Sequence, residues 1–542
     1  MALIAAHWPL LRLPYFWDEA GYYIPTARDL LLAGSLIPHS TPSNAHPPLL
    51  MAWLALAWKI FGYSPLVART AMLLIAAFGL LAVFELAREV ANREVAIAST
   101  LCVALYPVYF AQSSLTHVDL AAAALTLWGI LFYVRRRFGL AAVWFALAAL
   151  AKETAILAPL ALFGWELVAG FIFSNPELER GIPTEPETRR FPRICWLLLP
   201  LLPLALWFAY HRAKTGYIFG NPDFFRYNVA ATLQPVRIAL AMLRRGWQLV
   251  GHMNLYVLTL ATALAMFFPP QPDGSRARQR IAVPTQLAFA AVIIAYCLAL
   301  SLIGGAVLAR YLLPVIPLVI IVCVSTIWRR IRGWQLITAL VCAAFVAGLF
   351  INPPYVFAPE DNLAYRDYVH LHQDAAQFLA AHDPRARVLT AWPASDELRR
   401  PWLGYVRRPI HAVQIENFSR EEVDAAAQNA GFDVALIFST KYEPPHRLPA
   451  PAFWQRAQTR FFDYHRDLEP EEAAQILGGE IIFWEKRSGQ WVAVIAVSQI
   501  HSASLRTRHF SVGVGGQKCI DSQRFREHNS QSQSLLPSST AS

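Results

Sequence analysis

The sequence predicts a polytopic α-helical membrane protein of about eleven spans with a C-terminal extracytoplasmic α/β domain. Of its 542 residues, 56% are hydrophobic and only 15% are charged, and the mean hydropathy is +0.36; this composition is typical of membrane proteins. Apolar runs of about 20 residues, the length of a bilayer-spanning helix, recur up to residue 352. The polar character after that point predicts three parts: a membrane domain over 1–352, the α/β domain over 353–498 and a disordered tail over 499–542.

The charge and cysteine content argue against a nucleic-acid-binding protein and against a protein stabilised by zinc or disulfides. The formal charge of +10 does not indicate a nucleic-acid partner, because the basic residues form short clusters between apolar runs. Five of the six cysteines lie inside apolar runs and the sixth in the polar tail, with no spacing typical of a zinc site or a disulfide framework. We interpret them as small core hydrophobes.

The first apolar segment is unusual. Residues 1–16 are too short to span comfortably and include His7 and Arg12. They have neither the basic start nor the small-residue cleavage site of a signal peptide. We therefore expect the first span to be incomplete in the sequence as given.

Ten further apolar segments are candidate spans: 64–88, 95–111, 115–134, 139–151, 155–173, 194–210, 253–268, 283–303, 306–327 and 334–351. Five of the connecting loops are basic, at Arg88 with Arg93, at 135–137, at Arg189, Arg190 and Arg193, at Arg276, Arg278 and Arg280, and at Arg329, Arg330 and Arg332. All five fall on one side, which the positive-inside rule makes cytoplasmic. The alternate loops and the α/β domain are then outside, in a plasma (inner) membrane.

Two apolar stretches in the first external loop are expected to lie flat on the membrane surface. Residues 47–62 have the length of an interfacial or re-entrant helix, and a span there would place every later basic cluster outside. Residues 22–34 are similar, because Tyr23, Ala27 and Leu30 share one helical face.

The polar part after residue 352 alternates strand-like and helix-like segments. Strands are expected at 387–392, 433–439 and 480–497, and helices over 364–382 and 419–431. This alternation predicts a small α/β domain.

Several ionisable residues fall independently on the external side: Asp18, Glu19, His39, His46, His117, Asp119, Lys152, Glu153 and Arg310. Ionisable groups at such depths are costly and tend to be functional, so a cavity at the outer leaflet is expected. Each also has a structural interpretation. The Asp18-Glu19 pair could be a solvated helix start, Asp119 a helix cap, His39 and His46 turn residues, Lys152 a snorkelling side chain and Arg310 an interface anchor. We interpret Arg212, Lys214, Arg226, Arg244 and Arg245 as headgroup-contacting charges, with a phosphate-binding role left open.

The order of several motifs resembles a known family. The segments WDEAGYY, HPPLL, SPLVARTAMLLIAAFGLLAVFELAREV, AQSSLTHVDLAAAALTLWGI, LAKETAILAPLAL and ARYLLPVIPL follow one another between residues 13 and 352. In this order they resemble the GT-C glycosyltransferases, and among these glycosyltransferase family 39, the branch of protein O-mannosyltransferases and lipid A aminoarabinose transferases. Two motifs depart from the family pattern: THVD stands for its Arg-Pro-Asp-like run, and Lys152-Glu153 for its Lys-Gly.

The resemblance implies a hexosyl or pentosyl transferase whose donor is a polyprenyl-phosphate sugar. It maps a catalytic acid onto Asp18 with Glu19 beside it, and a second acid onto Asp119. Lys152 and Arg310 map onto donor-binding cations, and the candidate substrate-binding set includes His46 and His117. Because adjacent residues of a helix or turn point in different directions, only one carboxylate of the pair can face the sugar; the resemblance selects Asp18. No cofactor is expected.

The chemistry agrees with these residue types. A carboxylate suits the base that takes the acceptor proton, and cations can stabilise a phosphate leaving group without a protonating acid. A single displacement inverts the anomeric configuration. The partners expected are the lipid donor, membrane lipid and an acceptor that the sequence does not identify.

Three alternatives stay open. A transporter or flippase of lipid-linked sugars would also place charges in the membrane, although we find no internal repeat and the charges gather on one side. The chain could be a sensor whose α/β domain binds a ligand. The acids and histidines of the external loops could also form a divalent metal site, although their spacings are irregular.

Overall fold

The computed structural model describes residues 2–497 apart from short gaps, and these residues lie within one compact unit of the chain. The gaps are 174–191, 221, 223–224, 227–231, 274–275, 430, 443, 445–451, 463 and 465. The expected disordered tail over 499–542 lies outside the described residues.

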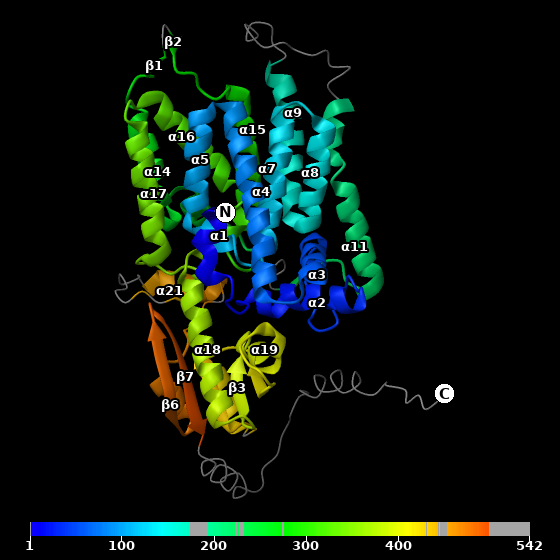
Figure 1. The fold of residues 1–542 in the computed structure, drawn as a ribbon, viewed down its shortest axis with the longest axis vertical. Helices are drawn as coiled ribbons and strands as arrows, with labels where there is room; N and C mark the ends of the chain where they lie inside the picture. The colour runs from blue at the N-terminus through cyan, green and yellow to red at the C-terminus, as the bar shows by residue number, and fades with distance from the viewer. Residues whose placement is uncertain are drawn as a thin grey trace, which may run out of the picture. The chain divides into compact units, whose positions relative to one another are not determined.

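Each of the ten apolar segments contains a helix, as the sequence predicted, and these helices run side by side in Figure 1. They are α4 (Pro65–Val90), α5 (Arg93–Leu105), α7 (Val118–Val134), α8 (Phe138–Ala151), α9 (Leu157–Phe173), α11 (Leu201–Thr215), α14 (Leu255–Ala265), α15 (Val283–Leu302), α16 (Ile316–Arg330) and α17 (Trp334–Phe350). Within the described residues, three helical segments are long and apolar enough to cross a membrane: Pro65–Val90, Pro192–Thr215 and Val283–Leu302. The total of eleven spans and their orientation therefore stay predictions.

Side-chain caps fix where the first long helices begin. The Ser64 hydroxyl accepts a hydrogen bond from the backbone N–H of Val67 before α4, and the Asn92 side chain accepts one from Val95 before α5. Such caps satisfy backbone donors that the first turn of a helix leaves free. Because α5 begins so soon after α4 ends, the two helices pack against one another.

The two stretches expected to lie flat on the membrane surface, 22–34 and 47–62, both form helices. They form α2 (Ile24–Ala33) and α3 (Leu49–Phe61), joined by a loop that Asp29 ties down by accepting hydrogen bonds from the backbone N–H groups of His39 and Ser40 at 2.7 and 2.8 Å. Helix α3 buries Leu54 and exposes Phe61. Their position on a membrane surface stays a prediction.

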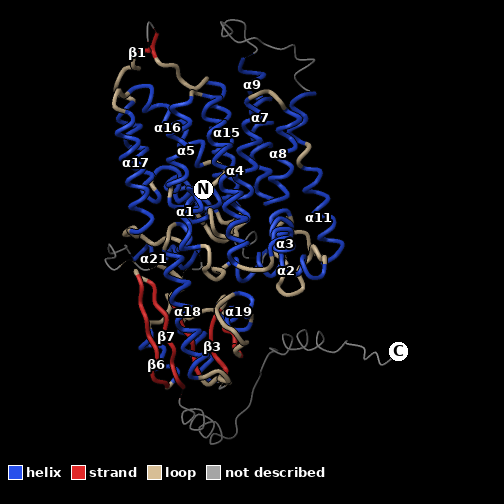
Figure 2. The backbone as a smooth tube through the Cα atoms, viewed as in Figure 1, coloured by secondary structure: helices blue, strands red, loops and turns tan. Residues whose placement is uncertain are grey.

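The segment after residue 352 has the expected α/β character. Its sheet has the order β4-β3-β5-β7-β6, in which β3 is parallel to β4 and β5, and β7 is antiparallel to β5 and β6. The strands are β3 (Arg387–Ala391), β4 (His411–Ile415), β5 (Val434–Phe438), β6 (Gly479–Arg487) and β7 (Gln490–Val497), drawn in red in Figure 2. The helices are α18 (Ala364–His382), which packs on β6 and β7, and α19 (Ala394–Arg399), α20 (Arg420–Gln428), α21 (Ala452–Phe462) and α22 (Pro470–Leu477). The sequence analysis missed β4, an edge strand with exposed polar residues.

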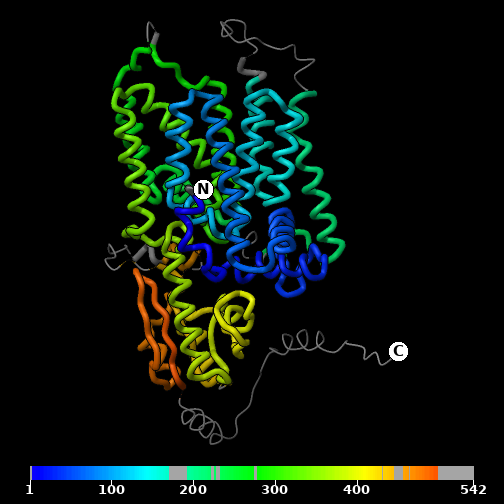
Figure 3. Tube along the Cα trace, in the orientation of Figure 1, coloured from blue at the N-terminus to red at the C-terminus, as the bar shows by residue number. Residues whose placement is uncertain are grey.

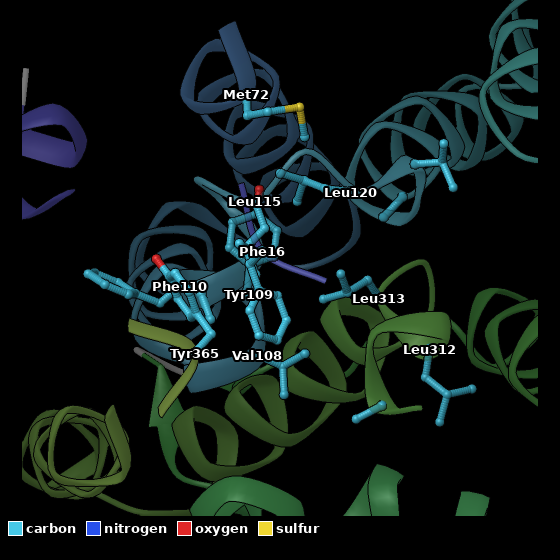
Figure 4. Packing of buried hydrophobic residues seen from close by; sticks show 14 of the residues in the cluster. Phe16, Met72, Val108, Tyr109, Phe110, Leu115, Leu120, Leu312, Leu313 and Tyr365 are labelled. Atoms are coloured by element: carbon cyan, nitrogen blue, oxygen red, sulfur yellow. The ribbon is translucent and has the colours of Figure 1, made fainter. Parts of the chain in front are cut away.

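One continuous apolar core joins the helices and the sheet. Figure 4 shows Phe16 of the N-terminal segment, Tyr109 and Tyr365 of α18 among the packed residues of this core, and the rings of Phe16 and Tyr365 lie 5.9 Å apart. Tyr109 is on the short helix α6 (Pro107–Gln112) and donates a hydrogen bond to the Ala76 carbonyl of α4 at 2.7 Å. In Figure 3 the blue N-terminal segments run along the side of the helical bundle that faces the yellow and orange α/β part.

The orientation of the α/β part can be tested by cysteine labelling. In a Cys519→Ser background, we expect Arg385→Cys, at an exposed loop position, to react with an impermeant maleimide on intact cells. The matched control Arg332→Cys, exposed in a basic loop, should react only after the membrane is permeabilised. Labelling of Arg332→Cys alone on intact cells would reverse the predicted topology.

Candidate active site

The buried side chain of Arg310 lies at the centre of a cluster of charged groups. It belongs to the short helix η8 (Ala309–Leu312) and is 2% exposed. Its guanidinium forms ion pairs with Asp18, with Asp119 (Nε to Oδ2, 3.3 Å) and with Glu360 (Nη1 to Oε1, 2.8 Å). These carboxylates come from three distant parts of the chain, and Glu360 lies in η9 (Pro359–Asp361), just after α17.

Lys152 extends the cluster. It follows the last residue of α8, and its ammonium donates a hydrogen bond to Asp119 Oδ1 at 2.5 Å. Asp119 lies in the first turn of α7 and therefore bridges Lys152 and Arg310. We call Asp18, His117, Asp119, Lys152, Arg310 and Glu360 the Arg310 cluster.

His117 orients Arg310 through a chain of hydrogen bonds. The Gln112 amide donates from Nε2 to the Glu360 carbonyl at 3.2 Å, so its Oε1 faces His117 Nδ1 at 2.8 Å. Because an amide oxygen only accepts, Nδ1 carries the proton in its contact with Gln112. Arg310 Nη1 lies 3.0 Å from Nδ1 and 3.2 Å from Nε2, so it packs over the imidazole ring. The ring of His117 thus supports the guanidinium of Arg310.

Asp18 is the most accessible carboxylate of the cluster. Its side chain is 22% exposed, against 2% for Asp119 and 7% for Glu360. It immediately precedes the π-helix η2 (Glu19–Tyr23), but its side chain makes no capping hydrogen bond and pairs with Arg310 instead. The helix-start interpretation of Asp18 therefore does not describe its contacts.

Glu19 points the other way, into a fully buried ion pair with Arg69 of α4 at 3.2 Å. Its Oε2 also accepts from the Phe16 backbone N–H, and its Oε1 from the backbone N–H and hydroxyl of Thr116, each backbone bond being 2.6 Å long. Arg69 in addition donates to the carbonyls of Leu13, Pro14 and Ser114. Both oxygens of Glu19 are occupied, so this carboxylate fixes the backbone that carries Asp18.

His46 lies beside the cluster and pairs with another acid. Its Nδ1 is 2.8 Å from Glu153 Oε2. The Tyr23 ring stands between His46 and His117, with centroid separations of 6.0 and 5.8 Å. His39 donates its backbone N–H to Asp29, in agreement with its interpretation as a turn residue.

Arg245 is a further buried cation. It lies on α13 (Pro235–Val250) and is 0% exposed, so the headgroup-contacting interpretation of this residue is wrong. Its Nη1 donates to the Leu308 carbonyl at 2.6 Å and to Gln248 Oε1 at 2.8 Å. Within the described part of the chain its Nε and Nη2 have no hydrogen-bond partner. The guanidinium lies 5.6 Å from the Tyr311 ring.

Three cations lie around the ring of Tyr311. Lys152 Nζ lies 3.9 Å from its centroid, and the guanidinium carbons of Arg245 and Arg310 each lie 5.6 Å from it. Arg310 and Lys152 face carboxylates, whereas no ion pair of Arg245 is found among the described residues. A buried cation without a counter-ion is costly, so this arrangement favours an anion beside Tyr311.

Burial raises the pKa of Glu360 to about 8, although the nearby Arg310 acts in the opposite direction and the neighbouring acids add to the rise. Asp18 and Asp119 are the other carboxylates that face Arg310, and Asp119 also faces Lys152.

The described residues contain no preformed site for the metal ion considered in the sequence analysis. No group of three or more His, Cys, Asp or Glu side chains in the described ranges is arranged to hold a metal ion. Of the residues considered for such a site, Glu19 and His46 pair with other partners. Metal dependence itself stays untested.

Comparisons with known proteins agree with the expected family. Residues 45–180 match the family model described as dolichyl-phosphate-mannose-protein mannosyltransferase. The fold is similar to that of ArnT from Cupriavidus metallidurans bound to undecaprenyl phosphate, with a TM-score of 0.52 and 14% identity, over 93% of this chain and 97% of that one. The oligosaccharyltransferase of Archaeoglobus fulgidus gives a TM-score of 0.42 and 13% identity, over 78% of this chain and 64% of that one. No curated protein matches by sequence.

These findings confirm the resemblance to GT-C glycosyltransferases, at the level of the fold and of the matched family model. Five of the seven candidate residues meet in the Arg310 cluster, and Glu19 and His46 lie beside it. The sequence analysis missed Arg69, Glu360 and Tyr311. Arg69 had a readable signal, because it is a cation inside a long apolar segment.

The buried pair should matter for stability. We expect Glu19→Gln to destabilise the fold by about 3–5 kcal/mol, because it leaves Arg69 buried without its counter-ion. Asp374→Asn is the matched control, since it breaks a half-exposed pair with Arg487 and should cost at most about 1 kcal/mol. Thermal unfolding of both variants in detergent measures the difference, and equal unfolding temperatures would refute the structural role of Glu19.

Proposed function

We propose that this chain is an integral-membrane inverting glycosyltransferase that moves a sugar from a polyprenyl-phosphate donor to an extracytoplasmic acceptor. The observation that carries the proposal is the Arg310 cluster, in which one accessible carboxylate lies against buried cations. Support also comes from the family-model match and from the fold shared with ArnT, whose structure is bound to undecaprenyl phosphate. A plasma (inner) membrane location with an external α/β part belongs to the same proposal.

Asp18 is the proposed catalytic base. Its carboxylate is the one of the cluster that a bound acceptor can reach most readily. It takes the proton of the acceptor hydroxyl while the acceptor oxygen attacks the anomeric carbon. The bond from that carbon to the phosphate oxygen breaks, and its electron pair leaves with the polyprenyl phosphate. Attack opposite the leaving group inverts the anomeric configuration.

The phosphate of the donor is proposed to lie beside Tyr311. Arg310 and Lys152 are both paired with Asp119. Arg245 has two guanidinium nitrogens without a partner among the described residues, so a phosphate would satisfy it directly. The three cations together neutralise the charge that develops on the leaving group. His117 contributes by orienting Arg310. His46 pairs with Glu153 at the edge of the site.

The primary experiment is transfer from a panel of radiolabelled polyprenyl-phosphate hexoses and pentoses by the full chain in detergent. Turnover without a membrane gradient supports the enzyme and identifies the sugar. Movement of the lipid-linked sugar across proteoliposomes without any transfer would instead favour the transporter. Full activity after exhaustive chelation would remove the metal hypothesis.

Asp18→Asn should lower turnover by at least about 100-fold, because a general base contributes roughly 10²–10⁴-fold in rate. Donor binding should stay close to that of the wild type, and the unfolding temperature should fall less than in Glu19→Gln, because Arg310 keeps Asp119 and Glu360 as partners. Asp383→Asn, in the loop after α18, is the matched control and should leave turnover unchanged. Retention of more than about a tenth of the wild-type turnover would contradict the role of Asp18.

Arg245→Gln should raise the donor KM by about 10-fold or more, the expected loss for charge-assisted hydrogen bonds to phosphate. Arg310→Lys and Lys152→Ala should also raise it, since Arg310 loses its planar fork and Lys152 its charge. Arg244→Gln is the matched control, because Arg244 is the exposed neighbour of Arg245 on the same helix. A donor KM unchanged in all three test variants would exclude this phosphate site.

A further inference from the structure

The backbone that carries Asp18 has an unusual conformation. Trp17 has a φ of +43°, which is rare for a bulky residue, and the five residues that follow Asp18 form a π-helix. Such conformations persist only when their surroundings hold them in place. Glu19 holds one side of this turn through Arg69 and Thr116.

The other side is held by Trp392, from the α/β part. Trp392 directly follows β3, a strand that pairs with a neighbour on each side. Its indole packs edge-to-face on Trp17, with ring centroids 5.5 Å apart, and lies 5.6 Å from the Tyr22 ring. A Cβ atom on Gly21 would come within 2.3 Å of the same indole. Because Gly21 has no Cβ atom, the Trp392 ring can pack directly against the backbone of the π-helix.

Further contacts attach the α/β part to the same region. The Tyr15 N–H donates to the Leu403 carbonyl at 3.4 Å, and the Tyr405 hydroxyl donates to the Tyr15 carbonyl at 3.0 Å. Arg400 donates to the Ser40 carbonyl at 2.6 Å, in the loop between α2 and α3. Trp392 therefore sits on a surface that is itself fixed against the chain segment preceding Asp18.

We propose that Trp392 is a positioning residue that holds the π-helix so that the Asp18 carboxylate faces the reacting sugar. The inference rests on the proposed function and makes turnover depend on the α/β part. Without the indole, the turn can relax toward an ordinary helical geometry, which redirects Asp18. A misplacement of about 1 Å in a reacting group can cost roughly 100-fold in rate. The donor phosphate site, built on Tyr311 and its cations, does not include Trp392.

The first test compares full-length variants in detergent. Trp392→Ala should lower kcat by about 10-fold or more while the donor KM changes less than about twofold, because the ring orients the base and does not bind the phosphate. Trp392→Phe should recover part of the loss, since it restores an aromatic face. Trp484→Ala, which removes a 52% exposed tryptophan of β6, is the control and should match the wild type. Wild-type kcat in Trp392→Ala, or a rise in donor KM of the same size as the fall in kcat, would overturn the proposal.

A double-mutant comparison tests the contact itself. Gly21→Ala should lower kcat because its Cβ displaces the indole, and the same substitution should cost little in a Trp392→Ala background, where the space is open. If Trp392→Ala does not fold, Gly21→Ala combined with Trp392→Phe replaces it, and partial recovery of kcat is expected. Additive losses would overturn the contact.

Hydrogen–deuterium exchange gives a readout independent of activity. Amides of Glu19–Tyr23 should exchange faster in Trp392→Ala than in Trp484→Ala, and equal exchange would count against the proposal. A wild-type chain that transfers no sugar from any donor would refute the proposed function, whereas an active wild type with an unaffected Trp392→Ala would refute only this inference.

Discussion

The burial of the Arg310 guanidinium is the constraint on which much of this structure depends. A cation removed from water must be compensated, and breaking a buried pair is far more costly than omitting it. Arg310 meets this requirement with carboxylates from the N-terminal segment, from α7 and from the segment after α17. Segments remote in sequence are therefore held at one point by charge, in addition to their apolar packing. The same interaction places the most accessible of these acids at the edge of the site.

The sequence predicted the helices well because the length and apolarity of a membrane helix are local properties. It also predicted that acids and cations would gather on one side, and that Asp18 and Glu19 would point in different directions. The sequence did not predict which residues these charged groups pair with. Nothing in the spacing of Glu19 and Arg69, or of Arg310 and Glu360, shows that they form pairs, because those contacts depend on how whole helices pack.

Helix α13 shows a second reason why part of the site was missed. It buries Arg237, Arg245 and Gln248 and exposes Leu243 and Trp247. In a water-soluble protein the apolar face of a helix turns inward, but the solvent of a membrane protein is apolar as well. The sequence alone does not tell which face such a helix turns to the protein, and basic residues in an external loop are easily assigned to lipid headgroups. Strand β4 was missed for a simpler reason, since a short edge strand with polar residues gives little alternation.

The continuous core between the helices and the sheet bears on how such proteins can diversify. Phe16 packs against both Tyr365 and Tyr368 of α18, and these rings belong to the same apolar cluster as the strands of the sheet. A chimaera that joined this sheet to another bundle would leave mismatched aromatic surfaces on both halves. The two parts are therefore expected to evolve by concerted substitution, not by shuffling, and a secreted version of the sheet alone would expose aromatic surface prone to aggregation.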